Sequence, residues 1–268
     1  MAGTSRAKRS SSATYQSIVS YDGTDFHGFQ RQAEDQRTVQ QVLEYALRQI
    51  GWQDDSVNAA GRSDRGVHAE GQVIAFDLKW DHSAEDLTAA LNANLPNDVA
   101  VRKSKRTFNG FHPRFDALSR SYRYTFFVDP LRDPLRERYA WRLLQEPDPD
   151  LIHRAVRVFE GEHDFAAFGR PPEGSLNTVR HVHVSAWHPC EDRYELHIEA
   201  NAFLYHMVRH IAGAVIDVAV GREDPGRLQV MLDNPTVRRE GRLAPAAGLC
   251  LIGVKYEWAK ARPAPEDD

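Results

Sequence analysis

The densest group of residues that could do chemistry lies in one short segment, residues 60–73, which reads AGRSDRGVHAEGQV. Three glycines shape this segment, and Asp64 lies between Arg62 and Arg65. In the simplest interpretation it is a tight turn in which Asp64 accepts hydrogen bonds from its own backbone, the commoner outcome for such a pattern. In the alternative interpretation a glycine-shaped loop presents a carboxylate that neighbouring cations keep ionised, which suits a nucleophile or a charge stabiliser.

Metal and cofactor chemistry have weaker signals. The chain has twelve histidines, and His206 and His210 are spaced four apart on one predicted helical face. Two histidines without a cysteine or glutamate at ligand spacing are a weak signal for zinc, so we predict no metal site. The sequence also lacks GxGxxG after a strand and the GxxxxGK(S/T), HExxH and GxSxG motifs. Nicotinamide and P-loop chemistry are therefore poor interpretations.

The distribution of charge points to an anion-binding surface. The net charge is −4, yet 28 of the 34 basic residues are arginine, which holds phosphate oxygens through a planar two-pronged fork. Genomic base composition explains an arginine excess equally well. However, segment 102–123 holds seven basic residues against Asp116 alone. Because a solvated strand face usually mixes charges of both signs, we interpret this segment as a local anion-binding surface.

The elements that must position these residues do not alternate regularly. Period-two patterning predicts strands at 15–21, 72–78, 98–107, 120–128, 179–187, 193–200 and 249–258. Capping residues and apolar stripes predict helices after Thr38, Ser83, Asp148 and Asp224, and a strongly apolar helix at about 203–219. Strands in runs, separated by single helices, favour an α+β protein with a largely antiparallel sheet over a doubly wound parallel fold.

Length and composition limit the class of protein. At 268 residues the chain is near the size at which one hydrophobic core splits, so we expect one large domain or two fused lobes. It has no apolar run long enough for a membrane span, no apolar segment behind its basic N-terminus, and only two cysteines. These features argue against secreted, membrane, collagen-like and disordered proteins and favour a cytoplasmic one. We expect residues 1–14, a basic tail, and residues 259–268 to be disordered.

The segment GRSDRGVHAEGQV resembles the signature of the TruA family of tRNA pseudouridine synthases, usually GR-T-D-A-G-V-H followed by G-Q-V. Further blocks of that family are matched in order by YDGTDFHGFQRQ at 21–32, LNANLPNDVAVR at 91–102, FHPRFDALSRSYRYTF at 111–126, GEHDFAAF at 161–168, NAFLYHMVRHIAG at 201–213 and APAAGLCLIGV at 244–254. The resemblance covers about residues 15–258. Ser63, Arg65 and His210 depart from the usual pattern, and none of these changes removes a group that the chemistry needs.

The resemblance implies an isomerisation in which uracil is detached from C1′ of its ribose, turned, and rejoined through C5. Asp64 matches the essential aspartate, which acts covalently or by proton abstraction at the sugar. Tyr122 matches the tyrosine that packs on the target base, and Arg209 matches the arginine that pairs with the aspartate. The apolar neighbours of Arg209 in the predicted helix favour a carboxylate partner independently, because an unpaired buried guanidinium is costly. This pairing should keep Asp64 anionic at neutral pH.

Two further residues have roles implied by the resemblance. Arg62 is placed to enter the RNA stack where the flipped nucleotide has left, since a planar cation can both stack and contact phosphate. Leu249 resembles the apolar residue that lines the base pocket, although an ordinary core leucine is an equally good interpretation.

The resemblance also implies the pseudouridine-synthase fold, an α+β architecture of two lobes that share a mostly antiparallel mixed sheet with a central cleft. We expect an N-terminal lobe at 15–113, which carries the catalytic aspartate loop, and a C-terminal lobe at 114–258. The implied substrate is uridine at positions 38, 39 and 40 of the tRNA anticodon stem-loop, with a homodimeric enzyme and no cofactor. Two alternatives stay open: a noncatalytic tRNA-binding or tRNA-folding protein on the same scaffold, and a synthase that acts on another RNA.

Overall fold

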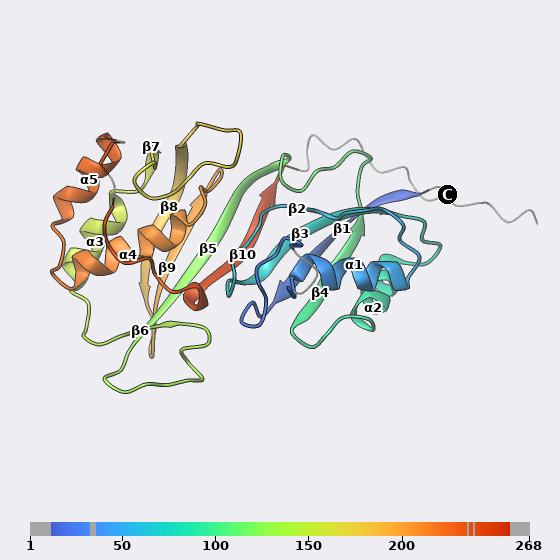
Figure 1. Ribbon diagram of the computed structural model, residues 1–268, viewed down its shortest axis with the longest axis horizontal. Helices are drawn as coiled ribbons and strands as arrows, with labels where there is room; N and C mark the ends of the chain where they lie inside the picture. Colours follow the sequence, from blue (N-terminus) through green and yellow to red (C-terminus); the bar gives the residue numbers. More distant parts are fainter. Residues whose placement is uncertain (1–11, 33–35, 235, 238, 258–268) are drawn as a thin grey trace, which may run out of the picture.

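The computed structural model describes residues 12–32, 36–234, 236–237 and 239–257. Within these ranges ten strands form one sheet in the order β4-β1-β3-β10-β5-β9-β8-β7, with β2 paired to β3 and β6 to β5 (Figure 1). Strand pairs are antiparallel except β10 with β3 and β5 with β6. The strands are β1 (Ala13–Tyr21), β2 (Asn58–Ala59), β3 (His68–Leu78), β4 (Val99–Arg106), β5 (Ala117–Val128), β6 (Trp141–Leu143), β7 (Gly161–Asp164), β8 (Val179–Pro189), β9 (Tyr194–Ala200) and β10 (Leu249–Tyr256). The predicted α+β class with a mostly antiparallel sheet is confirmed.

Five α-helices and one 3-10 turn lie in the described ranges, and four of the α-helices begin directly after a predicted capping residue. They are α1 (Val39–Gln49), α2 (Ala84–Asn92), α3 (Pro149–Arg157), α4 (Met207–Ala219), α5 (Pro225–Asp233) and a 3-10 turn, η1 (Ala246–Gly248). The side chains of Thr38, Ser83, Asp148 and Asp224 each accept a backbone N–H of the first turn, as such caps do. In the described ranges, no helix is long and apolar enough to cross a membrane.

Several predicted boundaries need correction. Strand β1 begins at Ala13, inside the predicted tail 1–14, because Ala13 and Thr14 pair with the far end of β3. The rest of that tail, residues 1–11, and all of 259–268 lie outside the described residues. Helix α4 begins at Met207 rather than at residue 203, because the preceding residue adopts a left-handed backbone conformation that a helix cannot contain. The short strands β2, β6 and β7 were not predicted.

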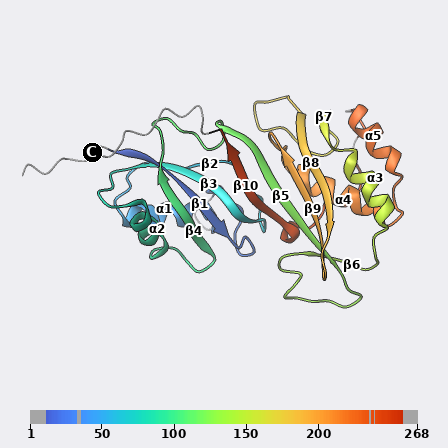
Figure 2. The same cartoon turned by 180° about the vertical axis from the view of Figure 1, so that it is seen from behind.

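Two clusters of buried side chains occupy the two halves of the sheet. One packs α1 and α2 against β1, β3 and β4, and the other packs α3, α4 and α5 against β5, β8 and β9 (Figures 1 and 2). Strand β10 joins the halves: it lies between β3 and β5, and it contributes Leu249 to one cluster and Leu251 to the other. The final strand of the chain therefore ties the N-terminal half to the C-terminal half.

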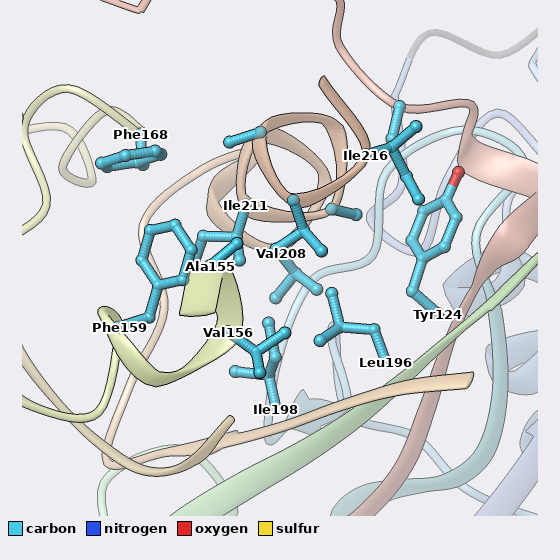
Figure 3. Close-up of a cluster of buried hydrophobic side chains, with 14 of the residues drawn as sticks. Tyr124, Ala155, Val156, Phe159, Phe168, Leu196, Ile198, Val208, Ile211 and Ile216 are labelled. Carbon is cyan, nitrogen blue, oxygen red and sulfur yellow. The ribbon is translucent and has the colours of Figure 1, made fainter. Parts of the chain in front are cut away.

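Helix α4 is fixed by the second cluster. Its apolar residues belong to the same cluster as those of α3 and β9, and Figure 3 labels several of them: Val208, Ile211 and Ile216 from α4, Ala155 and Val156 from α3, and Leu196 and Ile198 from β9. Removing a buried side chain of this kind typically costs about 2–5 kcal/mol. Because so much apolar surface holds the helix in place, the remaining residues of its first turn are also held at fixed positions.

Candidate active site

A cleft of about 520 Å³ opens where the two halves of the sheet meet. Its walls come from segments far apart in the sequence. They include the 60–64 loop, Tyr122 of β5, the 202–209 segment at the start of α4, and Leu249 of β10. All five of the residues singled out from the sequence, Arg62, Asp64, Tyr122, Arg209 and Leu249, line this cleft.

The backbone of the loop that carries Asp64 is held by the 21–32 segment. The N–H of Phe29 donates to the Ser63 oxygen at 3.0 Å. Gly28 has φ of 96°, and a Cβ at this position would lie 2.8 Å from the same oxygen, so only glycine allows this approach. Gly23 packs as closely, since a Cβ there would lie 2.0 Å from the Val67 oxygen. The two motif segments thus fold together because glycines let their backbones touch.

Side chains beneath the loop complete its support. The Ser63 hydroxyl lies 2.8 Å from the hydroxyl of Tyr21, a buried residue whose pKa is raised to about 12 by burial. The fully buried Gln72 donates to the Gly61 oxygen at 2.9 Å. Both contacts use neutral hydrogen bonds, so they hold the loop without placing a charge beside Asp64.

Asp64 and Arg209 meet in the cleft although they are 145 residues apart in the sequence. The Arg209 Nη1 lies 3.3 Å from Asp64 Oδ2, with the two side chains 13% and 16% exposed. The Arg209 Nε donates to the Ala244 oxygen at 2.8 Å, which orients the guanidinium plane. The carboxylate partner that the apolar surroundings of Arg209 require is therefore Asp64.

His206 also contacts Asp64, a role that the sequence did not reveal. Its Nε2 lies 3.3 Å from Asp64 Oδ2. Burial lowers the pKa of His206, and the cations Arg209 and Arg170 lower it further, whereas Asp64 raises it. The sequence distinguishes His206 only by its spacing from His210, a weak signal for a metal pair. Among the described residues no group of three or more potential ligands could hold a metal ion. The sequence held no signal for this contact, because it depends on the left-handed backbone of His206, which precedes the first residue of α4.

Tyr122 and Leu249 form the apolar part of the cleft. The half-buried Tyr122 ring meets Phe203 edge-on, with ring centroids 5.0 Å apart. Burial raises the pKa of Tyr122 above its usual value, so the phenol is neutral at physiological pH. Leu249 is buried at the first position of β10. Together these side chains offer a planar, apolar surface beside a carboxylate.

The predicted basic surface at 102–123 needs correction, because its residues do not form one patch. Strand β4, with four of them, is separated from β5 by three other strands. Arg123 is paired with Glu70 at 2.5 Å. Arg120 is buried and donates to backbone oxygens, including those of Ala60 and Asn201. These residues are close in the sequence but far apart in the structure, because the chain crosses the sheet between β4 and β5. The basic residues that reach the cleft are Arg62, Arg114, Arg120, Arg180 and Arg209.

Comparison with known proteins adds an independent observation. A family model described as tRNA pseudouridine synthase matches residues 18–116 and 155–257. The chain belongs to the tRNA pseudouridine synthase family. This confirms the resemblance noted from the motifs, and the family is one of isomerases. The matched ranges include Asp64, Arg209 and Leu249, whereas Tyr122 falls between them.

Curated relatives from this family match nearly the whole chain. A tRNA pseudouridine synthase A from Pseudothermotoga lettingae is 38% identical over 90% of this chain and 99% of its own length. The enzymes of the same name from Geobacter sp. (strain M21) and Bacillus subtilis are 39% and 36% identical, each over 89% of this chain and 97% of their own length. Among solved structures, a Cbf5-Nop10-Gar1 complex aligns at 15% identity and a TM-score of 0.34 over 75% of this chain and 45% of that chain.

Proposed function

We propose that this pseudouridine synthase family member isomerises uridine to pseudouridine in tRNA, at positions 38, 39 and 40 of the anticodon stem-loop. The observation that carries the proposal is the Asp64–Arg209 pair, which lies beside the Tyr122 ring in a cleft between the two halves of the sheet. The names of relatives that align over about 90% of this chain support tRNA as the substrate.

The reaction needs a carboxylate at the ribose. The N1–C1′ bond of uridine breaks, the freed uracil turns, and C5 bonds to C1′; the proton lost from C5 is balanced by the proton gained at N1. Asp64 either attacks the sugar and is later displaced, or removes and returns a proton on the sugar. Arg209 stabilises the anionic form in both cases. Product and substrate contain the same atoms, so the proposed reaction needs no redox cofactor or group donor, and we propose no metal.

The apolar wall of the cleft can hold the uracil while it is detached from the ribose. In our proposal the Tyr122 ring packs on the uracil, and Leu249 closes the pocket from β10. A stacked aromatic contact tolerates rotation of the uracil in its own plane, because dispersion against a flat ring depends little on that rotation. The neutral hydroxyl of Tyr122 can donate a hydrogen bond to a uracil oxygen.

Access to the glycosidic bond requires base flipping. Extruding a nucleotide from a stem costs a few kcal/mol. Arg62 is exposed at the cleft, two residues before Asp64, where it can fill the gap in the stack and contact phosphate. We further propose that the enzyme acts in the cytoplasm as a homodimer, with tRNA as its macromolecular partner.

The direct test is to map pseudouridines in tRNA before and after incubation with the protein. We expect new pseudouridine at positions 38, 39 or 40 of tRNAs that carry uridine there. Modification at other positions or only in another class of RNA would support the alternative of a differently targeted synthase. Tight tRNA binding without any pseudouridine would support a noncatalytic tRNA-binding or tRNA-folding protein.

A further inference from the structure

We propose that His206 is a positioning residue for Asp64, which together with Arg209 holds carboxylate oxygen Oδ2 so that Oδ1 faces the substrate. The inference deepens the proposed function and rests on its assignment of Asp64 as the reacting carboxylate. It assigns a specific task to His206, whose presence neither the family motifs nor the weak signal for a metal site explains.

The shared oxygen is the first observation. The His206 Nε2 and the Arg209 Nη1 each lie 3.3 Å from Asp64 Oδ2. In the part of the chain that the structure describes, no hydrogen bond or ion pair reaches Oδ1. A nitrogen of His206, which precedes α4, and a nitrogen of Arg209 in the first turn of α4 therefore both lie at Oδ2, and Oδ1 is left for a ligand. A carboxylate held at one oxygen loses its freedom to rotate about the Cβ–Cγ bond.

The backbone at His206 is the second observation. Its φ of 64° is left-handed, and no other non-glycine residue in the described ranges has a positive φ. Glycine adopts this conformation without strain, and the histidine forms no side-chain cap for α4. A helix start alone thus gives no reason for histidine here. Strained backbone of this kind persists where the surrounding structure holds it, and such residues cluster at active sites.

The neighbours of His206 fix its ring. The ring of Tyr205 stacks on the imidazole, with centroids 3.7 Å apart. The Tyr205 backbone exchanges two hydrogen bonds with Arg170, at 2.9 and 3.3 Å, which anchors this turn to the 165–170 loop. The imidazole is thus held between Tyr205 and Asp64, with little freedom to leave the carboxylate.

The charge state of His206 suits this task. The charged or titratable groups around it are Asp64, Arg209, Arg170, His210 and Tyr205, and of the charged ones Asp64 favours the protonated ring whereas the arginines oppose it. With its pKa below the usual 6.5, the ring is mainly neutral at neutral pH. A neutral imidazole in contact with Oδ2 restrains the carboxylate without adding a second full positive charge, which would reduce its reactivity.

The experiment uses the full chain and a tRNA substrate at neutral pH, and it compares single-turnover rates at saturating tRNA, tRNA Kd and Tm. In His206→Gly we expect the rate to fall by about tenfold or more, because the carboxylate loses one of its two polar contacts. Its Kd should stay within about threefold and its Tm should be retained or raised, because glycine relieves the strained backbone. In His206→Gln, whose amide nitrogen reaches about as far as Nε2, the rate should recover to within about threefold of the wild type. His210→Asn, one turn along the same helix, is the matched control and should keep the wild-type rate.

The inference is overturned if His206→Gly keeps its rate, if His206→Gln is as slow as His206→Gly, or if the loss appears only in Kd. A fall in Tm for His206→Gly also overturns it, since His206 would then be a structural residue. The Asp64→Asn variant distinguishes a failure of the proposed function from a failure of the inference about His206. If that variant still forms pseudouridine, the proposed role of Asp64 fails; if it is inactive while His206→Gly is fully active, only the inference about His206 fails.

Discussion

The contact between Asp64 and Arg209 predicts an energetic coupling that a double-mutant cycle can measure. The charged atoms lie 3.3 Å apart, with only 16% and 13% of the side chains exposed. At an effective dielectric constant of about 20, the Coulomb attraction at this distance is about 5 kcal/mol. The loss of hydration of both groups offsets much of that attraction, so we expect a coupling free energy of about 1–3 kcal/mol.

The assay is urea unfolding of four proteins at neutral pH: the wild type, Asp64→Asn, Arg209→Met and the double variant. Arg209→Met should be the less stable single variant, because it leaves a largely buried carboxylate with His206 as its remaining partner. The more exposed pair of Arg132 and Glu137, 2.9 Å apart with side chains 74% and 22% exposed, is the control and should couple by less than about 1 kcal/mol. A coupling between Asp64 and Arg209 no larger than that of the control would refute the claim that burial makes this pair strong.

Three other predictions follow from charge, burial and packing. The affinity for tRNA should weaken steeply with salt: for each tenfold rise in salt concentration, log K should fall by roughly 0.7 to 0.9 per phosphate neutralised. The Arg62→Gln variant should reduce this slope. An affinity of the wild type that does not change with salt would rule out a phosphate-driven interface. Burial lowers the pKa of His210 to about 4, while the unfolded chain takes up that proton near pH 6.5, so stability should fall from pH 6.5 to about 4. Thermal melts of His210→Asn should show a smaller fall over that window, and an identical fall would contradict the buried neutral state. Gly23→Ala would place a Cβ 2.0 Å from the Val67 oxygen, so it should displace the Asp64 loop and lower both Tm and turnover; normal values of both would show that the contact is easily relieved.

Local signals in the sequence predicted most of the elements. Caps such as Thr38 and Asp148 act within a few residues of themselves, so they mark helix starts whatever the rest of the chain does. Alternation likewise marked β8 and β9, where one face is buried. The short strands β2 and β6 carry only two and three residues and have no period to detect, since they exist because longer strands offer them a partner.

The site was predictable in part. The apolar neighbours of Arg209 required a carboxylate, and the motif pattern nominated Asp64, so their meeting followed from two separate arguments. The contact of His206 was not predictable, because it depends on a single left-handed residue that shifts the start of α4. The prediction of a basic surface at 102–123 was wrong for a topological reason, because three strands lie between β4 and β5 in the sheet.

The central claim is that the Asp64 carboxylate carries out the isomerisation. The most direct measurement is pseudouridine formation and tRNA binding on one preparation of Asp64→Asn, beside the wild type. The amide keeps the size of the side chain but removes the charge, so turnover should fall below detection. The Kd for tRNA should stay within about tenfold, roughly 1.4 kcal/mol, because phosphate contacts come from other residues. Substantial pseudouridine formation by folded Asp64→Asn would contradict the account and move the chemistry to another group in the cleft.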